Sequence, residues 1–201
     1  MDNKKSLPTL LFATQNQGKL LEARKLCAEA PIELIAPSPD DTLDVAETGS
    51  TFAQNAELKA VAFAKKYNCV TIADDSGLEV TALGGEPGVA SRRWFPGSDE
   101  QRVAALLEKM QHQTERSARF VTVLCLYNPS DASVVFFEGY VTGTVAQKPA
   151  GLAGFGYDPI FVPTGFTKSF AELGTDQKNA ISHRAQAFHK LCAYIQTHTF
   201  A

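Results

Sequence analysis

Short apolar runs and helical patterns alternate through the first 75 residues of the chain. The runs Leu10–Ala13, Glu33–Ala36 and Cys69–Ala73 predict strands, because each is brief and mainly apolar. Between them, apolar residues return at spacings of three and four over residues 20–27 and from residue 51 to about 66, which predicts two helices. Strands that alternate with helices are typical of an α/β fold with a largely parallel central sheet.

The second half of the chain follows a different order. The predicted elements are a helix capped by Asp99 and running to Met110, two antiparallel strands at Ala118–Tyr127 and Ser133–Val145, a Gly/Pro-rich stretch over residues 149–163, and a terminal helix over about 181–198. The antiparallel pair is expected to form a second sheet or lobe. A length of 201 residues suits one domain, so we expect a single domain over residues 1–201, built as two closely packed lobes.

Charge and hydropathy narrow the range of partners. Nineteen Lys and Arg against 22 Asp and Glu give a net charge of −3, so no overall positive field attracts a nucleic-acid backbone. The longest apolar runs fall far short of the ~20 residues that span a bilayer, and the N-terminus lacks the apolar region of a signal peptide. We expect a cytoplasmic protein that binds neither nucleic acid nor membrane.

The first candidate site is a polar turn between the first predicted strand and the first predicted helix. Its residues are Thr14, Gln15, Asn16, Gln17, Gly18 and Lys19. Backbone N–H groups at a helix start attract phosphate, and the hydroxyl, amide and ammonium groups of this turn add donors. The turn is not a P-loop, because Ala13 and Leu20 stand where that pattern needs Gly and Ser or Thr. The alternative is a capped helix with a solvated lysine.

A second candidate is the pair of adjacent carboxylates, Asp74 and Asp75, which with Ser76 directly follow the third predicted strand. Ligands of α/β sheets gather beyond the carboxyl ends of strands, where such carboxylates hold Mg²⁺ or take a proton from water. Glu47, in a polar loop, and Lys59, in the second predicted helix, are expected to converge on the same edge. The alternative is an ordinary turn, for which Asp, Ser and Gly are typical, with the lysine at the surface.

Two further candidates lie toward the C-terminus. Glycines surround Phe155 and Tyr157, which indicates a backbone held close to a flat ligand with an aromatic ring available for stacking. Lys178, His183 and Arg184, near the opening of the last predicted helix, carry donors suited to phosphate or to the carbonyl oxygens of a base. The alternatives are a Gly-rich loop whose aromatic rings fill the core, and basic side chains in solvent beside a helix cap.

Together these segments resemble the inosine triphosphate pyrophosphatase family, also called the Ham1 or RdgB family. Seven motifs in order carry the resemblance, from about residue 10 to 190: Thr14-x-Asn16-x-x-Lys19, Glu47-Thr-Gly-x-Thr-Phe52, Asn55-Ala-x-x-Lys59-Ala60, Ala73-Asp-Asp-Ser-Gly-Leu78, Gly85-x-Pro-Gly88, Gly154-Phe-Gly-Tyr-Asp-Pro-Ile-Phe161 and Ser182-His-Arg-x-Gln-Ala187. The resemblance implies an α/β fold of two lobes around a central cleft, with a mixed central sheet flanked by helices, and a homodimer. It also implies Mg²⁺-dependent hydrolysis of ITP, dITP and XTP to the monophosphate and pyrophosphate, which removes deaminated purines from the nucleotide pool.

The resemblance further implies roles for individual residues. Asp75 is the expected general base and a Mg²⁺ ligand, Glu47 is a second ligand, and Asp74 is linked to the metal or orients the site. The expected contacts of the triphosphate are the turn Thr14, Gln15, Asn16, Gln17, Gly18 and Lys19, joined by Lys59 and Lys178, while Ser76 contacts the substrate and Phe155, Gly156, Tyr157, Asp158, His183 and Arg184 surround the base. Gln15 stands where the family more often has Gly, and its side chain either narrows the turn or points to solvent.

The chemistry of these residues suits the implied reaction. Cleavage between the α- and β-phosphates needs a water activated near the α-phosphorus, a role for Asp75, and stabilisation of the leaving pyrophosphate by Mg²⁺ and the three lysines. Donors from His183 and Arg184 pair with the C6 oxygen of hypoxanthine or xanthine but face a donor in adenine, so ATP is expected to be rejected. Two other classes fit parts of the pattern: a phosphatase with an aspartate nucleophile that releases orthophosphate, and a nucleotide-binding module without turnover.

Overall fold

The computed structural model describes residues 7–38 and 43–198 of the chain. The strands are β1 (Thr9–Phe12), β2 (Glu33–Ile35), β3 (Thr71–Val80), β4 (Ser117–Asn128), β5 (Ser133–Val145) and β6 (Phe161–Pro163). The α-helices are α1 (Gln17–Leu26), α2 (Phe52–Tyr67), α3 (Asp99–Lys109), α4 (Phe170–Ile181) and α5 (His183–Thr197). Three short 3-10 helices complete the described elements: η1 (Thr81–Leu83), η2 (Gly88–Ala90) and η3 (Asp158–Ile160).

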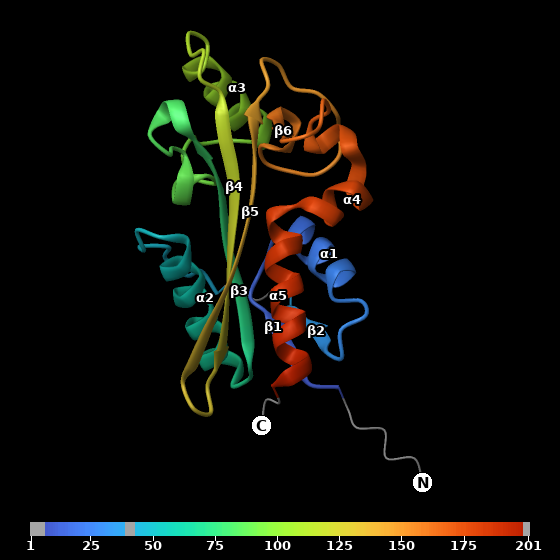
Figure 1. Cartoon of the computed structure of the whole chain (residues 1–201). Helices are drawn as coiled ribbons and strands as arrows, with labels where there is room; N and C mark the ends of the chain where they lie inside the picture. Colours follow the sequence, from blue (N-terminus) through green and yellow to red (C-terminus); the bar gives the residue numbers. More distant parts are fainter. Residues whose placement is uncertain (1–6, 39–42, 199–201) are drawn as a thin grey trace. The chain divides into compact units, whose positions relative to one another are not determined.

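The strands form a six-stranded sheet in the order β2-β1-β3-β4-β5-β6 (Figure 1). β1 is parallel to both β2 and β3, as the alternation of strand and helix predicts, and β6 is antiparallel to β5. Residues 129–132, which join β4 to β5, are far too few for the crossover that parallel strands need, so these neighbours are antiparallel. The prediction of an α/β fold with a mixed sheet is therefore confirmed.

The chain divides into two compact units. Unit 1 comprises Met1–Asp75, Val123–Phe137 and Ala187–Ala201, and unit 2 comprises Ser76–Thr122 and Glu138–Gln186. The division falls inside β3, between its two central polar residues Asp75 and Ser76. The expectation of one domain over residues 1–201, with two lobes around a central cleft, stays a prediction.

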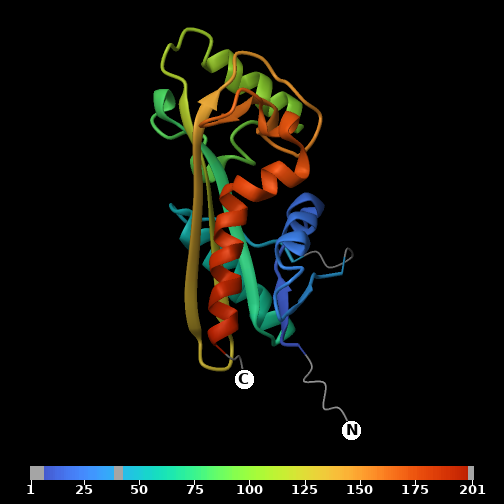
Figure 2. The same ribbon diagram turned by 45° about the vertical axis from the view of Figure 1, so that its right-hand side comes forward.

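In unit 1, successive residues of β1 point to opposite faces of the sheet, and both faces are buried. Leu10 and Phe12 join an apolar cluster that includes residues of α1 and α5. Leu11 packs instead with Ala56 and Ala60 of α2. The two views show the same layers, with α2 on one side of the strands and α1 with α5 on the other (Figures 1 and 2). A strand that is buried on both faces has a continuous run of apolar residues, which is why this strand can be predicted from the sequence.

Unit 2 has its own apolar cluster, built largely from aromatic rings. The Phe120 ring lies 4.7 Å from that of Phe161 and 6.0 Å from that of Phe170, measured between centroids. Val103 and Leu106 of α3 are buried in the same cluster. Burying an aromatic or branched aliphatic side chain contributes roughly 1.5–3 kcal/mol, so these contacts fix α3, the start of α4 and β6 within the unit.

The prediction that Asp74, Asp75 and Ser76 directly follow the third strand is wrong, and so is the alternative that they form an ordinary turn. These residues lie inside β3, which continues to Val80. Asp74 pairs with a lysine of α1, and Asp75 with a lysine of α2. Aspartate is more typical of turns than of strands. Here lysines distant in sequence neutralise Asp74 and Asp75, and the strand continues past both residues.

Two helices also differ from the sequence-based expectation. Ser98, not Asp99, caps α3, because its side chain accepts a hydrogen bond from the backbone of Gln101 while the Gln101 side chain bonds back. No helix was predicted where α4 lies. A break at Gly174, with φ +77° and ψ 168°, interrupts the helical pattern there and conceals the element in the sequence.

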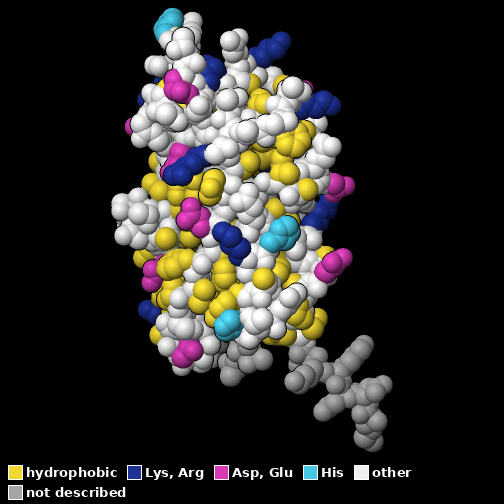
Figure 3. All heavy atoms as spheres, in the orientation of Figure 1, with side chains coloured by type: hydrophobic (Ala, Val, Ile, Leu, Met, Phe, Trp, Pro, Cys, Tyr) yellow, Lys and Arg dark blue, Asp and Glu magenta, His cyan; other side chains and the backbone are white. Residues whose placement is uncertain are grey.

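Surface properties agree with the composition. Lys and Arg side chains alternate with Asp and Glu over the face drawn in Figure 3, so the described residues of this face form no continuous positive area. Within residues 7–38 and 43–198, none of the helices combines the length and the hydrophobicity that a bilayer-spanning segment requires.

Candidate active site

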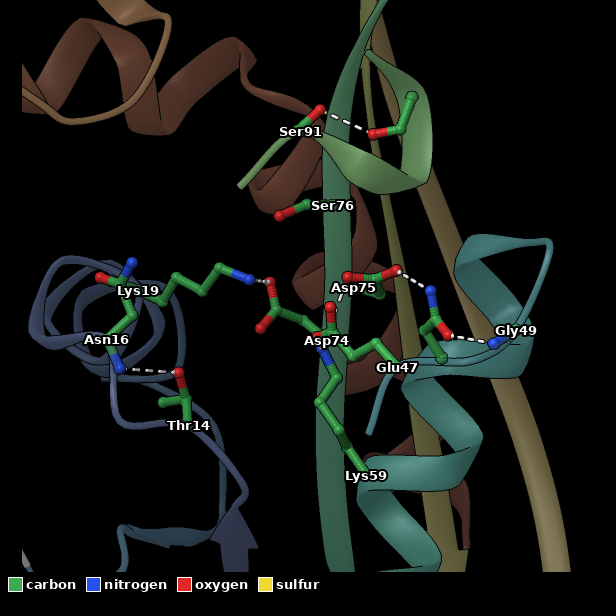
Figure 4. Close-up of polar contacts among 12 residues, drawn as sticks. Thr14, Asn16, Lys19, Glu47, Gly49, Lys59, Asp74, Asp75, Ser76 and Ser91 are labelled. Atoms are coloured by element: carbon green, nitrogen blue, oxygen red, sulfur yellow. Dashed lines mark hydrogen bonds and ion pairs between the residues drawn. The ribbon is translucent and has the colours of Figure 1, made fainter. Parts of the chain in front are cut away.

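The predicted phosphate turn leads from β1 into α1. Asn16 caps the helix, since its Oδ1 accepts a hydrogen bond from the Lys19 backbone at 3.1 Å, and its own N–H donates to Thr14 Oγ1 at 3.2 Å (Figure 4). The cap agrees with the plainer alternative, but the lysine is not solvated. Lys19 is 16% exposed and its Nζ lies 2.9 Å from a carboxylate oxygen of Asp74. Gln15 and Gln17 are exposed beside these contacts.

The predicted convergence of Glu47 and Lys59 on Asp75 is confirmed. Lys59 Nζ lies 2.7 Å from Glu47 Oε1 and 3.4 Å from Asp75 Oδ1, so one ammonium group contacts carboxylates from the segment before α2 and from β3 (Figure 4). All these groups are at least partly buried, and Asp75 is 5% exposed. The contacts lie midway along β3 and not beyond its carboxyl end, because the strand is longer than predicted.

Burial and charge oppose each other at this cluster. Burial raises the pKa of the Asp75 carboxyl above its ordinary value, and the nearby Lys59 ammonium offsets part of that rise. Burial alone would lower the pKa of Lys59, but the charges of Asp75, Asp74 and Glu47 outweigh it, so the net shift is upward. Lys59 is therefore firmly charged, whereas Asp75 binds a proton more readily than an exposed aspartate does.

One neighbour of Asp75 received no role from the sequence. Asn55 of α2 donates its side-chain N–H to Asp75 Oδ2 at 3.1 Å. The sequence does hold a signal for it, since Asn55 and Lys59 are four residues apart and so share one face of the helix. A polar side chain one turn before a predicted functional lysine lies on the same face of the helix and can contact the same partner, here Asp75.

The carboxylates suit Mg²⁺ in kind, although the three predicted ligands do not form a compact set. In the described part of the chain, no three His, Cys, Asp or Glu side chains come together as a metal-binding group. Glu47 and Asp75 nevertheless present oxygen atoms to one shared positive charge, that of Lys59. Mg²⁺ prefers such oxygen donors and is commonly held by one or two carboxylates together with substrate phosphates and water, so the donor set fits this ion.

In unit 2, the predicted base-binding residues gather around Phe155. Lys178 Nζ bonds Asp158 Oδ2 at 2.6 Å, and both side chains are almost fully buried. The same carboxylate oxygen accepts the Phe155 backbone N–H at 3.0 Å. Lys178 Nζ also lies 4.8 Å from the Phe155 ring centroid. Asp158 and Phe155, which contact Lys178, both belong to the segment expected at the base.

Of the paired residues at the start of α5, Arg184 lies in the same group, whereas His183 contacts Phe120. The Arg184 guanidinium carbon is 5.5 Å from the Phe155 ring centroid, and its Nη2 donates to Ser76 Oγ at 3.1 Å. The His183 ring stacks on Phe120 with centroids 4.7 Å apart and planes 9° apart. Both residues are buried, so the alternative of solvated basic side chains is wrong for this pair.

The Gly-rich loop is anchored at several atoms. Tyr157 is 4% exposed and packs in the core of unit 2, with its hydroxyl donating to the Ser91 carbonyl, so it presents no open ring face. The Gly156 N–H donates to Asp99 Oδ2 at 2.7 Å, a contact the sequence did not indicate. Gly154 has φ +80°, and a Cβ there would lie 2.1 Å from Asp158 Oδ2, so only glycine fits.

Comparison with known proteins finds relatives over nearly the whole chain. A profile of the Ham1 family matches residues 10–194. A Symbiobacterium thermophilum protein named dITP/XTP pyrophosphatase is 47% identical over 180 residues, which is 89% of this chain and 90% of that protein. The solved structure of the Staphylococcus aureus Ham1 protein is 42% identical with a TM-score of 0.82, covering 94% of this chain and 98% of that one. A HAM1 protein from Coxiella burnetii is 37% identical with a TM-score of 0.87, covering 95% of this chain and 100% of that one.

Proposed function

We propose that this chain, which belongs to the Ham1 family, is a pyrophosphatase that hydrolyses dITP, XTP and ITP to the monophosphate and pyrophosphate. The observation that carries the proposal is the surroundings of Asp75, a buried carboxylate beside the Lys59 ammonium and Glu47. A relative that is 47% identical over 180 residues bears the name dITP/XTP pyrophosphatase. We further propose that the protein acts in the cytoplasm as a homodimer.

The residues of unit 1 serve the triphosphate. The turn at the start of α1 supplies hydrogen-bond donors, and Lys19 and Lys59 supply positive charge. Asp74, through its contact with Lys19, holds that lysine in position. Charge placed in advance where the leaving pyrophosphate gains negative charge lowers the barrier to cleavage.

Asp75 is the general base. Its carboxylate takes a proton from a water molecule, and the water oxygen forms a new bond to the α-phosphorus. The bond from the α-phosphorus to the oxygen that bridges it to the β-phosphorus breaks, and that electron pair leaves with pyrophosphate. A raised pKa suits Asp75 to this role, because a base accepts a proton best when its pKa approaches the working pH.

Mg²⁺ is the proposed cofactor, with Glu47 and Asp75 as its ligands from the protein. When bound, it would neutralise charge on the phosphate oxygens. Lys59 contacts both of these carboxylates, so the protein itself holds them near one another.

The residues of unit 2 serve the base. Arg184 and His183 are the proposed donors to the C6 oxygen, and Phe155 lies beside the arginine. We assign Lys178 to this group, since it contacts Asp158 and Phe155. Donors directed at C6 favour hypoxanthine and xanthine and disfavour adenine, whose C6 amino group is itself a donor.

The test is a substrate panel with product analysis. Purified protein is incubated with dITP, XTP, ITP, dATP or GTP, with Mg²⁺ or with EDTA, and the phosphorus products are separated. We expect pyrophosphate and monophosphate from the first three substrates, little from dATP, and none in EDTA. Release of orthophosphate would identify an aspartate-nucleophile phosphatase instead, and binding without products would identify a non-catalytic module.

A further inference from the structure

A buried amide joins the segment that carries Glu47 to the proposed general base. Asn55 is 0% exposed and lies in α2. Its Oδ1 accepts the Gly49 backbone N–H at 2.8 Å, and its Nδ2 donates to Asp75 Oδ2 at 3.1 Å (Figure 4). The amide therefore bridges two segments that flank the cluster.

The neighbours of this amide fix its orientation. A backbone N–H only donates, so Gly49 requires the amide oxygen of Asn55 on its side. The amide nitrogen is then turned toward Asp75, whose ionised carboxylate only accepts. Both partners demand the same orientation, and a flipped amide would lose both hydrogen bonds.

The backbone at Gly49 is packed tightly against Gln54 and Asn55 of α2. A Cβ added to Gly49 would lie 2.7 Å from Asn55 Oδ1 and 2.6 Å from Gln54 Cβ. Contacts below 3 Å require atoms to move, so the backbone at Gly49 sits as close to α2 as a glycine allows. Glu47, two residues earlier, is held at the same surface of the helix by its bond to Lys59.

The two carboxylate oxygens of Asp75 are each contacted from the same helix. Asn55 contacts Oδ2 and Lys59 contacts Oδ1, and the two residues lie one turn apart on α2. Two contacts from one rigid element fix both the position and the rotation of the carboxylate. Lys59 is also proposed to contact the phosphates. The role inferred for Asn55 depends only on its hydrogen bonds to Gly49 and Asp75.

We propose that Asn55 is a positioning residue, which holds the Asp75 carboxylate in the rotation needed to take a proton from water. The inference rests on the proposed function and adds to it a residue with no expected contact to the substrate. A displacement of about 1 Å in a reacting group can lower the rate on the order of 10²-fold. Loss of this amide should therefore reduce kcat and leave substrate binding nearly unchanged.

The test compares Asn55→Ala and Asn55→Asp with Gly49→Ala and the control Gln54→Ala. Asn55→Asp keeps an oxygen for the Gly49 N–H but sets a second oxygen against Asp75. Gly49→Ala displaces the amide while leaving both of its partners in the chain. Gln54 makes comparable bonds, to the backbones of Ser50 and Thr51, without touching Asp75, so its loss should lower the Tm and leave kcat unchanged.

We expect kcat for dITP to fall about 10²-fold in both Asn55 variants and at least 10-fold in Gly49→Ala, with KM within about threefold of wild type. Rates are divided by the folded fraction from thermal melts, so a purely structural role would lower the Tm and spare the corrected kcat. If Asn55→Ala fails to fold, the other two variants decide. A wild-type protein that releases no pyrophosphate overturns the proposed function and this inference together; an active wild type with unchanged kcat in Asn55→Asp and Gly49→Ala overturns the inference alone.

Discussion

At the scale of single residues, the cluster around Asp75 balances a cost of burial against specific contacts. Burial raises the pKa of this carboxyl, while Lys59 and the Asn55 amide favour the ionised form. An ionised group with neither contact would be too costly to bury, and a group with stronger contacts would be a poorer base. The net shift of the Asp75 pKa is upward, so this carboxyl binds a proton more readily than an exposed aspartate does.

Replacing Asp75 with asparagine tests its role as the base. We expect turnover of dITP to fall about 10²- to 10⁴-fold, because the amide has a similar shape but takes no proton from water. Nucleotide affinity, measured by calorimetry, should stay within a few fold. The exposed Asp131 offers a matched control, Asp131→Asn, with unchanged turnover. Full activity in Asp75→Asn would remove this residue from the role of base.

Replacing Lys59 with methionine tests the charge balance. Removing one partner of a buried ion pair typically costs about 3–5 kcal/mol, and here it leaves Glu47 and Asp75 without their shared cation. We expect a loss near the lower figure in the free energy of unfolding at pH 7.5, measured with urea. Lys65→Met, at an exposed position of the same helix, should cost less than about 0.5 kcal/mol.

The pH dependence of that loss has a definite sign. Without Lys59, the pKa of Asp75 rises further, because the lysine is the group that opposes the effect of burial. A carboxyl with a raised pKa in the folded state contributes most stability when protonated and loses that contribution as pH rises through the raised pKa. The difference between wild type and Lys59→Met should therefore shrink as pH falls from 7.5 toward 5. A constant difference over this range would contradict the charge account.

At the scale of elements, helix starts organise the local structure. The helices α1, α2, α3 and α4 begin after a residue whose side chain accepts a backbone hydrogen bond, namely Asn16, Thr51, Ser98 and Ser169. Such a cap contributes typically about 1 kcal/mol. In α1 and α2 the capped turn is also the part of the helix that leads to Lys19 or Asn55, so the caps position functional side chains as well as stabilise the helices.

The sequence predicts elements well where one periodicity dominates. The run Leu10–Ala13 and the helix that became α2 are covered by apolar partners, so their patterns are regular. The sequence predicts that the third strand ends before Asp74, because the charges that compensate Asp74 and Asp75 within β3 come from α1 and α2 and leave no local trace. The helix α4 was not predicted at all, because Gly174 divides it into two short halves.

The candidate site was predictable to a similar degree. Glu47, Lys59 and Asp75 could be expected together, because α/β topology brings polar residues of neighbouring segments to one region of the sheet. The contact of Asp99 with Gly156 could not, because the sequence already gives Asp99 a local explanation as the cap of a helix. A distant contact is not predictable from the sequence when the local position of the residue already explains its type.

The break in α4 gives a test at the scale of elements. Gly174 has φ +77° and ψ 168°, a region open essentially to glycine alone, and a Cβ there would meet no atom within 4 Å. We expect Gly174→Ala to cost about 1–3 kcal/mol in urea unfolding, from backbone strain and not from a clash. Gln177→Ala, exposed in the same helix, should cost less than about 0.5 kcal/mol. A Gly174→Ala protein as stable as wild type would show that the break is not required.

At the scale of the whole molecule, the residues proposed to bind the phosphates and those proposed to bind the base belong to different units. Lys19, Lys59 and Asp75 belong to unit 1, whereas Lys178 and Arg184 belong to unit 2. Each unit has its own apolar core, so each group of functional residues rests on a separate packed scaffold. Changes on the phosphate side should therefore leave base selectivity intact.

Paired variants test this division. Lys19→Met removes positive charge from the phosphates, which every nucleotide shares, so kcat/KM should fall about 10²-fold for dITP and by the same factor for dATP. Arg184→Lys keeps the charge but loses the forked donors, so kcat/KM should fall about 10- to 100-fold for dITP while the low value for dATP stays nearly constant. The ratio of dITP to dATP is thus preserved in the first variant and reduced in the second. Equal effects of Arg184→Lys on both nucleotides would mean that the arginine acts on a part of the substrate common to both, and selectivity would then fall to His183, the other proposed donor to the C6 oxygen.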